Sequence, residues 1–596
     1  MPFLLGMFGP FLQSSQKSHL ASIAANHARS KTVQTIITNN GIICAGQTDD
    51  ESPFSDPIIS LPENHGFFVG KLFDNQNFLP AAFTITDAHT ITHNPKMVMK
   101  QWWGRYAGAL YNTTTQRCTL VRDPQGLSTL FYIIIGGGVI FSTDLALLHD
   151  TLEKTPSLNQ SYFAEYISGT NYSSPLTPFN GILELLPGMG LHIQPNGSCS
   201  LEQLWNVAEC GGSFIADTDS FEHTLLNTMR SCLKAWVGES AGVCLELSGG
   251  ADSSGLMILL RDILPEHKNI IGINYIDSKT PSSNEIVHAQ EVADMCNAQL
   301  HFIDWQDASL LDPLPHAWRP NKPTTFLMFN KTGQQLHDFA LQHGCSEIMN
   351  GQGGDHVFLA PQPIDSLADY WLDKGLRGIT KPLAELSNTN RMPWWMLVRD
   401  TTKNIFKHYT THDDKLLNNE SGIYFDPAFM HNKKEEDFYL QKSIAQFYPA
   451  KKTHVKSLFH GVAFADRDQR IAGRTITHPL LSQPIVELGL RIPTYQSFNN
   501  GFDRIFFRNS VSRIKKPHAL WRTIKGDTNS SMAKSFAANA GHVQDMILDG
   551  YFGTSGIINK QWFCKEMAKI RHGHIDNLWP VIRFLTAQRW LDQWNK

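Results

Sequence analysis

The stretch that most constrains the fold is VCLELSGGADSSGLMILL, residues 243–260. Its first part, Val243 to Leu247, has the length and the bounding turn signals of a buried strand, and the apolar run after Gly255 favours a helix. Gly249 and Gly250 let the backbone turn sharply between them and approach another group closely. Because a helix N-terminus presents free N–H groups at the positive end of its dipole, this loop predicts a site for an anion, usually a phosphate.

Asp252 lies inside this loop, although a carboxylate repels phosphate. Its presence makes sense if a divalent cation lies between the two. A second loop, GQGGDH (residues 351–356), follows a later strand candidate and again sets an aspartate, Asp355, beside glycines. Both loops should lie at the carboxyl edge of one sheet, where Asp252 and Asp355 could share Mg²⁺. Taken alone, the second loop could equally be a tight strand–helix turn with a surface aspartate.

The surrounding pattern predicts two domains. Residues 32–46, 104–123, 130–142 and 181–198 are typical of β-hairpins. After a polar, glycine-bearing segment at 208–220, strand candidates (243–247, 270–277, 299–305 and the start of 347–355) alternate with helical stretches (221–237, 284–296 and 332–344). That alternation indicates parallel βαβ units in a doubly wound sheet, and the rest of the chain is mostly helical. We therefore predict domains at 1–210 and 211–596.

Composition excludes several classes of function. The 51 basic and 55 acidic residues leave a formal charge of -4, so neither nucleic acid nor an anionic membrane surface is an expected partner. The nine cysteines are scattered and form no CxxC pair, which favours a reduced, cytoplasmic protein. No stretch is long enough to span a bilayer, and the N-terminal MPFLLGMFGPFLQ lacks the basic segment of a signal peptide.

Several motifs in this order resemble the asparagine synthetase superfamily: SGGADSS, the stretch GRYAGALYNTTTQRCTLVRDPQGLSTLFY, and HPLLSQPIVELGLRIP followed by WRTIK. The resemblance implies an α/β two-domain fold. It has an N-terminal αββα Ntn amidotransferase-like sandwich and a C-terminal doubly wound α/β PP-loop ATP pyrophosphatase domain with a helical extension. It also implies that ATP and Mg²⁺ are used, with Asp252 and Asp355 as the metal ligands, Lys525 as the catalytic lysine and Ile273 on the adenine-binding strand. The other implied cofactor-binding residues are Ser248, Gly249, Gly250, Asp252, Ser253, Ser254, Gly353 and Gly354, of which Ser248, Gly249, Gly250, Ser253 and Ser254 would hold the phosphates.

Two departures from that family bear on the substrate. Glutamine-dependent members need a cysteine directly after the initiator Met, whereas this chain begins Met1-Pro2-Phe3 and its nearest cysteine is Cys44. An inactive amidotransferase-like domain is therefore expected. The second loop of asparagine synthetases reads close to GEGSDE, whereas here Gln352 replaces the glutamate and His356 replaces the last acid. The GGDH form followed by Val-Phe resembles the lasso peptide cyclases.

That resemblance implies an ATP-dependent, AMP-forming macrolactam synthetase. Such an enzyme adenylates an Asp or Glu side chain of a precursor peptide and closes an isopeptide bond onto the peptide's N-terminal amine. Lys525 would stabilise the developing negative charge, and Gln352 would orient the substrate. The implied partners are the precursor peptide, a leader peptidase and a leader-recognition protein. Two alternatives stay open: a small-molecule ligase that makes asparagine from ammonia or closes a β-lactam, and a non-catalytic scaffold.

Overall fold

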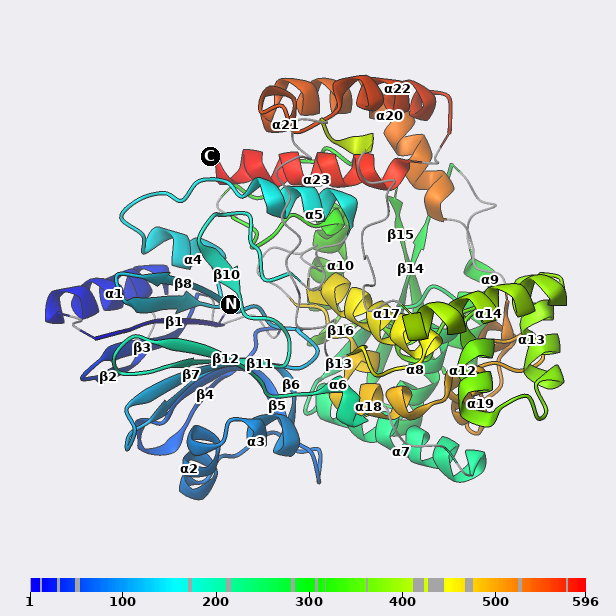
Figure 1. Ribbon diagram of the computed structural model, residues 1–596, viewed down its shortest axis with the longest axis horizontal. Coiled ribbons are helices and arrows are strands. Elements are labelled where there is room, and N and C mark those ends of the chain that lie inside the picture. Colours follow the sequence, from blue (N-terminus) through cyan, green and yellow to red (C-terminus); the bar gives the residue numbers. More distant parts are fainter. Residues whose placement is uncertain are drawn as a thin grey trace.

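The computed structural model describes residues 2–10, 13–28, 33–48, 54–169, 174–210, 215, 217–279, 285–305, 309–316, 318–360, 363–410, 423–426, 444–466, 475–523, 528–574 and 577–595. Its N-terminal half contains two stacked antiparallel sheets (Figure 1). The first has the order β10-β8-β9-β1-β3-β2, with β1 Pro2–Phe8, β2 Gln34–Thr38, β3 Gly41–Gln47, β8 Phe131–Ile135, β9 Gly138–Ser142 and β10 Ile182–Glu184. The second has the order β12-β11-β7-β6-β5-β4, with β4 Ile58–Ser60, β5 Gly66–Asp74, β6 Trp102–Asn112, β7 Arg117–Arg122, β11 Met189–Ile193 and β12 Cys199–Gln203.

One hydrophobic core fills the space between these two sheets, and helices cover their outer faces. Leu4 and Phe8 of the first sheet belong to the same buried cluster as Phe67 and Leu120 of the second. Helix α1 (Ser14–His27) packs on the outer face of the first sheet, where Leu20 lies in a cluster with β1 and β3. Helices α2 (Ile85–His93) and α3 (Lys96–Gln101) cover the outer face of the second sheet. Short helices α4 (Leu145–Asp150), α5 (Gln160–Ser168) and α6 (Val207–Cys210) complete this half.

Three of the four predicted hairpins are confirmed, as β2–β3, β6–β7 and β8–β9. The hairpin predicted at 181–198 is wrong. β10 pairs with β8 in the first sheet, while β11 pairs with β7 and β12 in the second, because the chain crosses between the sheets at Pro187 and Gly188. The hairpin forms one strand later, where the Gln194 N–H bonds the Ser198 carbonyl at 2.9 Å.

A third sheet, fully parallel, begins the second half of the chain. It has the order β15-β14-β13-β16, with β13 Gly242–Glu246, β14 Asn269–Ile276, β15 Gln299–Asp304 and β16 Glu347–Met349. Apolar residues of α7 (Thr218–Val237), α8 (Ala251–Ile263) and α9 (Ile286–Met295) pack on one face, and those of α10 (Asn330–Gln342) on the other. The predicted two-domain α/β class and the doubly wound parallel sheet are thereby confirmed.

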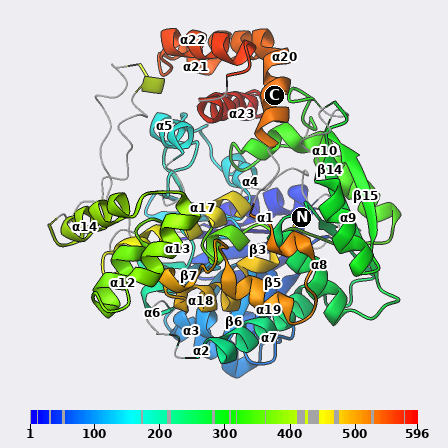
Figure 2. The same ribbon diagram turned by 90° about the vertical axis from the view of Figure 1, so that its right-hand side faces the viewer.

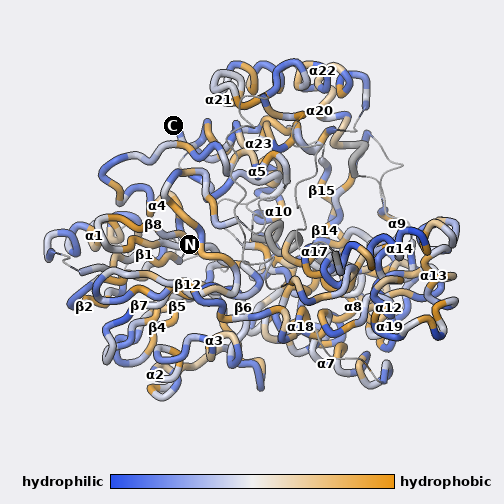
Figure 3. The backbone as a smooth tube through the Cα atoms, viewed as in Figure 1, coloured by the Kyte–Doolittle hydropathy of each residue, from blue (hydrophilic) through white to orange (hydrophobic). Residues whose placement is uncertain are grey.

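The remaining described chain is mainly helical and lies above and to the left of strands β14 and β15 in Figure 2. Figure 3 shows hydrophilic residues along much of the peripheral helices α14 and α22. None of the helices in the described residues is both long and apolar enough to cross a membrane. The helices are α11 Gly354–Val357, α12 Ser366–Lys374, α13 Thr380–Asn390, α14 Trp394–Thr410, α17 Pro449–Asp466, α18 Gln483–Arg491, α19 Ile505–Ser512, α20 Thr528–Asp549, α21 Tyr551–Thr554, α22 Lys560–Arg571 and α23 Leu578–Trp594.

The two halves share an aromatic interface. Trp103 of β6 and Trp236 of α7 are both buried, with ring centroids 5.7 Å apart, and Phe73 of β5 contacts the same indole at 5.1 Å. Trp103 is therefore a core residue. Lys71 of β5 also pairs with Glu347 of β16 across this interface. The N-terminal sheets are thus packed directly against the parallel sheet that carries the two glycine loops.

Candidate active site

The first glycine loop leads from β13 into α8, as predicted from its sequence. Gly249 adopts φ +79°, a conformation that side chains disfavour, and the loop turns there toward α9. The Ser253 hydroxyl pins the loop, because it accepts the Ser248 N–H at 3.2 Å and lies 3.1 Å from the Ser248 hydroxyl. Gly250 is the N-cap of α8. The free N–H groups of this helix N-terminus therefore lie beside hydroxyl groups at the carboxyl edge of the sheet.

The second glycine loop, between β16 and α11, lies directly against the first. A Cβ atom at Gly351 would lie 2.9 Å from the Ser253 nitrogen, and one at Gly354 would lie 2.3 Å from Asp252 Cγ. Both distances are too short for any side chain. Since β13 and β16 are neighbours while β14 lies on the other side of β13, the two loops meet at the topological switch point of the sheet. The glycines of the second loop are what allow this contact.

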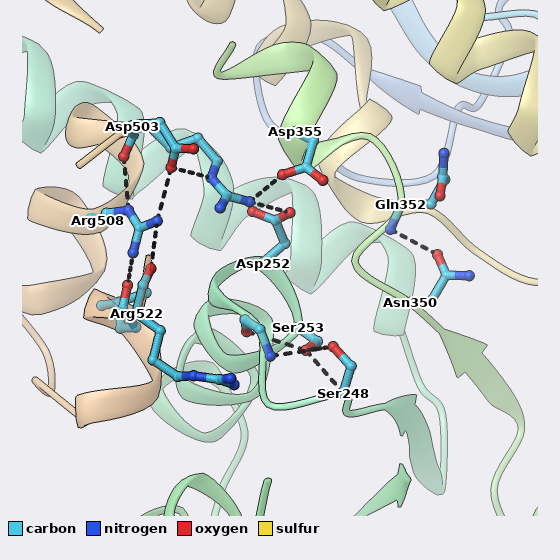
Figure 4. A network of polar contacts seen from close by, with 12 residues as sticks. Ser248, Asp252, Ser253, Asn350, Gln352, Asp355, Asp503, Arg508 and Arg522 are labelled. Carbon is cyan, nitrogen blue, oxygen red and sulfur yellow. Dashed lines mark hydrogen bonds and ion pairs between the residues drawn. The ribbon is translucent and has the colours of Figure 1, made fainter. Parts of the chain in front are cut away.

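Asp252 and Asp355 converge on one nitrogen atom (Figure 4). Arg504 Nη1 lies 2.8 Å from Asp252 Oδ2 and also contacts Asp355 Oδ1. The Arg504 side chain is 5% exposed, and those of Asp252 and Asp355 are 12% and 33% exposed. The structure therefore brings the two predicted carboxylates together, with a nearly buried guanidinium between them.

Arg504 is held in this position by its own backbone and by Asp503. Its φ of +52° is in the left-handed region, which is unfavourable for a residue with a side chain, and it directly precedes α19. Its Nε donates to Asp503 Oδ1 at 3.1 Å. Burial alone would lower the pKa of the Arg504 guanidinium, but the three neighbouring carboxylates outweigh burial and raise that pKa above its ordinary value. The guanidinium is therefore a permanent positive charge at this site.

Helix α19 can approach the site closely because residue 255 of α8, which faces it, is a glycine. A Cβ atom at Gly255 would lie 2.4 Å from the ring of Phe507, so only glycine allows this approach. Phe507 also stacks on Phe358, which follows α11, with ring centroids 5.1 Å apart. The helix that carries Arg504 is thereby packed against both helices that follow the glycine loops.

A chain of polar contacts continues from Asp503 to the first glycine loop, and Figure 4 shows its part from Asp503 through Arg508 to Arg522. Arg508 Nη2 donates to Asp503 Oδ1 at 2.8 Å and to the Arg522 carbonyl at 3.3 Å. Arg522 in turn donates from Nη1 to the Gly249 carbonyl at 3.2 Å, and its Nη2 pairs with Glu285 at 2.5 Å. The segment that leads toward Lys525 is thereby fixed to the loop. Lys525 itself lies outside the described residues.

Three other predicted site residues, Gln352, Ile273 and Ser254, lie in different surroundings from one another. The Gln352 N–H donates to Asn350 Oδ1 at 3.1 Å, and its side chain points away from the two carboxylates in Figure 4. Ile273 is fully buried in the core with Cys244 on the face of the sheet that α10 covers. Ser254 is also fully buried, and its hydroxyl has no hydrogen-bond partner in the part of the chain that the structure describes. Phosphate contacts by Ser254, an adenine contact by Ile273 and a substrate contact by Gln352 stay predictions.

The geometry of the carboxylates fits a shared cation. Oxygen atoms of Asp252 and Asp355 both lie within hydrogen-bond distance of one cationic nitrogen, so the two loops already direct carboxylate oxygens toward one point. Oxygen atoms are the ligands that Mg²⁺ prefers. If Arg504 withdrew, Asp252 and Asp355 would be the residues to hold the ion. The helix N-terminus beside them fits a phosphate group.

The roles of Asp503 and of the three arginines of the site, Arg504, Arg508 and Arg522, were not predicted from the sequence. The segment Asp503-Arg504-Ile-Phe-Phe-Arg508 places three charged residues around an apolar run. That pattern indicates buried ion pairing, because isolated charges are rarely buried. Nothing in the sequence says which residues they pair with.

The thiol of Cys44 is buried and its pKa is raised, whereas a nucleophilic cysteine is accessible and has a lowered pKa. Cys44 lies on β3, fully buried beneath α1, and burial raises the pKa of its thiol to about 11. Nucleophilic cysteines instead need a lowered pKa, because the thiolate is the reactive form. All nine cysteines lie in the described residues, and none of them is in a disulfide.

Comparison with known families decides what kind of protein this is. The family model "Asparagine synthase" matches residues 221–592, which contain both glycine loops and α19. The chain belongs to the asparagine synthase family. A second model, "Glutamine amidotransferase domain", matches residues 84–205 of the N-terminal half.

Individual relatives of this asparagine synthase-family chain are distant. It is 20% identical over 386 residues to "Amidase chyE" of Penicillium rubens, a match over 60% of this chain and 53% of that protein, so it spans about half of that relative's length. Among solved structures, a glutamine phosphoribosylpyrophosphate amidotransferase from B. subtilis is 12% identical, with a TM-score of 0.22, over 52% of this chain and 83% of the other. An NH3-dependent NAD synthetase from Campylobacter jejuni is 14% identical, with a TM-score of 0.18, over 37% of this chain and 100% of the other.

Proposed function

We propose that this protein is an ATP-dependent, amide-forming ligase, and that it is a lasso peptide cyclase. It would use ATP and Mg²⁺ to activate an Asp or Glu side chain of a precursor peptide, and then close a macrolactam onto the peptide's own N-terminal amine. AMP and pyrophosphate would be released. The proposed partners are the precursor peptide, a leader peptidase and a leader-recognition protein.

The observation that carries this proposal is the fit of the GQGGDH loop to Asp252. A serine at position 354, as in the GEGSDE loop of asparagine synthetases, would set its Cβ atom 2.3 Å from Asp252 Cγ on this backbone. The glycine that resembles the lasso peptide cyclases is therefore the residue that this site accommodates. His356 of the same loop has its Nδ1 2.9 Å from the Ser457 hydroxyl of α17, so the last residue of the motif anchors the loop to the helical region.

The residues of the chain would divide the chemistry as follows. The loop Ser248–Ser254 would hold the β- and γ-phosphates, and Arg522 would keep that loop in place through the Gly249 carbonyl. Mg²⁺, held by Asp252 and Asp355, would neutralise the charge of the triphosphate. The peptide carboxylate would attack the α-phosphorus and expel pyrophosphate. The peptide amine would then attack the acyl carbon, lose a proton and expel AMP.

Two further groups would contribute to the second step. Lys525 would stabilise negative charge that develops on the acyl oxygen and on the phosphate. Gln352, a neutral residue where asparagine synthetases have a glutamate, would orient the peptide. Holding the amine and the acyl carbon together is the main task of such an enzyme, because proximity can supply about 7–11 kcal/mol of the barrier in well-aligned systems. The N-terminal half would supply no ammonia, in agreement with the buried, weakly acidic thiol of Cys44.

The test is mass spectrometry of a candidate precursor peptide after incubation with the protein, Mg²⁺, ATP and a leader peptidase. We expect the core peptide to lose one water, with AMP and pyrophosphate formed in equal amounts. The Asp252→Ala variant should form neither. AMP formed with free aspartate or a small β-amino acid, and an unchanged peptide, would identify a small-molecule ligase instead. No AMP with any acceptor would identify a non-catalytic scaffold.

A further inference from the structure

Three side chains that can bind metal come together on the N-terminal half, far from the two glycine loops in sequence. They are Glu63 of the short 3₁₀ helix Pro62–Asn64, His65 directly before β5, and His89 of α2, which lies on the outer face of the second sheet (Figure 1). One potential ligand atom from each residue lies within 4.8 Å of those of the other two. Two imidazoles and one carboxylate are a ligand set that binds Zn²⁺ and related transition metals.

His65 is the residue that points to a bound ion. Its side chain is buried, at 1% exposure, and its Nδ1 lies 2.9 Å from the carbonyl oxygen of Tyr111. Because a carbonyl oxygen only accepts hydrogen bonds, Nδ1 carries a proton, and Nε2 is the ring nitrogen that can offer a lone pair to a metal. Nε2 is buried and has no hydrogen-bond partner in the part of the chain that the structure describes. Metal-binding histidines typically have this arrangement, with one ring nitrogen donating to a backbone carbonyl and the other free to bind the metal.

Glu63 and His89 complete the ligand set from the solvent side. Glu63 Oε2 lies 3.5 Å from His89 Nε2, and the two side chains are 55% and 46% exposed. In a tetrahedral zinc site, ligand atoms at 2.0–2.1 Å from the metal are separated by about 3.3 Å. The ring of His89 meets the ring of His65 edge to face, with centroids 4.6 Å apart. An ion could therefore enter from solvent and reach the buried nitrogen, and a water molecule could fill a fourth position.

A second cluster of similar composition lacks the feature that distinguishes the first. His288, Glu291 and His518 also have potential ligand atoms within 4.8 Å of one another. The Glu291 carboxylate, however, already accepts the N–H groups of His518 at 2.7 Å and Ala519 at 3.2 Å. None of these three residues has a buried side-chain atom without a partner, among the residues that the structure describes. Backbone capping explains this cluster.

We propose that Glu63, His65 and His89 form a zinc site. The bound Zn²⁺ would connect the turn before β5 to α2, and would thereby hold this helix on the outer face of the second sheet. The site is independent of the proposed peptide chemistry, since it lies on the amidotransferase-like half of the chain. The ion would have three protein ligands and one water.

The test uses full-length protein that has been treated with a chelator, loaded with Zn²⁺ and freed of excess metal by gel filtration. Metal content is measured for the wild type, Glu63→Gln and His89→Gln. His93→Gln is the matched control, because His93 lies on the same helix and its Nδ1 bonds the His89 carbonyl at 2.8 Å without joining the ligand set. We expect Glu63→Gln and His89→Gln each to bind one Zn²⁺ fewer per chain than the wild type and the control. Equal zinc content in all four proteins would overturn the proposal.

Two further measurements separate a built site from loose binding by surface histidines. Co²⁺ in place of Zn²⁺ should give the visible absorption of a four-coordinate ion in the wild type and in His93→Gln, and not in the two ligand variants. Zn²⁺ should raise the thermal unfolding midpoint of the wild type and of His93→Gln, and not that of the two ligand variants. An ion that binds the folded state stabilises it. His65 is left intact, so that no variant opens a buried position. An equal rise of the midpoint in all four proteins would contradict the site.

Discussion

Arg504 Nη1 lies 2.8 Å from Asp252 Oδ2 and contacts Asp355 through the same nitrogen, so that one guanidinium connects the two glycine loops of the protein. Asp252 and Asp355 are also the carboxylates that would hold Mg²⁺. A guanidinium and a metal ion cannot occupy the same position, so metal binding requires Arg504 to withdraw. The protein thus neutralises its two proposed metal ligands with an internal cation.

The first prediction concerns this competition. Arg504→Gln should lower the free energy of unfolding by about 3–5 kcal/mol in metal-free buffer, because it removes a buried cation that contacts both the nearly buried Asp252 and the partly exposed Asp355. Millimolar Mg²⁺ should restore part of that loss in the variant and have a smaller effect on the wild type. Urea unfolding with and without Mg²⁺ measures both effects.

The matched control for Arg504 is Arg230→Gln. Arg230 pairs with Asp262 at 2.6 Å on the surface of α7, and such pairs contribute about 0–1 kcal/mol. This variant should lose little stability and should respond to Mg²⁺ like the wild type. An identical response to Mg²⁺ in Arg504→Gln and the wild type would show that the arginine and the ion do not compete.

The second prediction concerns the contact between the glycine loops. Gly354→Ala should displace Asp252, since the new Cβ atom would lie 2.3 Å from its Cγ. Misplacement of a reacting group by about 1 Å can cost about 100-fold in rate, so we expect a loss of that order in AMP formation. Gly541→Ala in α20 is the control, because its Cβ atom would meet only the far end of Arg571, at 4.0 Å. Near-normal activity in Gly354→Ala would mean that Asp252 is not held as tightly as the contact indicates.

The third prediction concerns Arg522 and the phosphate loop. Arg522→Ala removes the hydrogen bond to the Gly249 carbonyl and the ion pair with Glu285. Hydrogen bonds that involve a charged group contribute about 1.5–3 kcal/mol, so the KM for ATP should rise by about 10- to 100-fold. Steady-state kinetics of AMP formation measure this rise, and Arg513→Ala, a surface arginine beyond α19, is the control. A fall in kcat with unchanged KM would instead indicate that Arg522 acts on the reacting groups.

Local sequence was enough to predict the loops and the sheet around them. The run from Val243 to Leu247 ends in two glycines, and a buried parallel strand followed by a helix is the structure that such a pattern favours. The same reasoning located Asp252 and Asp355 at one edge of the sheet, because the carboxyl ends of parallel strands meet there. The hairpin predicted at 181–198 was wrong, since turn residues at Pro187 and Gly188 do not reveal whether a chain returns or crosses to another sheet.

The arginines of the site could not be predicted in the same way. Arg504 is 252 residues from Asp252 and 149 residues from Asp355 in the chain, so no local pattern links them. Its place depends on the packing of α19 against α8, which in turn depends on Gly255 meeting Phe507. A charged residue within an apolar run indicates that some buried partner exists. Only the tertiary structure identifies that partner.

The fourth prediction concerns a buried lysine of the helical region. Lys451 of α17 is 8% exposed, and its Nζ donates to the carbonyls of Leu490 at 2.7 Å and Ile492 at 2.8 Å, near the end of α18. Burial lowers the pKa of Lys451 from 10.5 to about 8, against the weaker opposing effect of Asp369. Because the folded protein binds this proton less tightly than the unfolded chain, the contribution of Lys451 to stability is complete above pH 10.5. It is lost as the pH falls through about 8.

The stability of the wild type relative to Lys451→Met should therefore increase as the pH rises from 8 to 10. The full difference between the two pKa values corresponds to about 3 kcal/mol, because each unit is worth about 1.4 kcal/mol. Urea unfolding of both proteins at matched pH values measures the trend. Lys452→Met, which removes a partly exposed amine of the same helix, controls for the loss of one positive charge. The opposite outcome is a difference in the free energy of unfolding between wild type and Lys451→Met that stays constant with pH. It would mean that the amine has the same pKa in the folded and unfolded chains. The hydrogen bonds to the two carbonyls would then fully offset the cost of its burial.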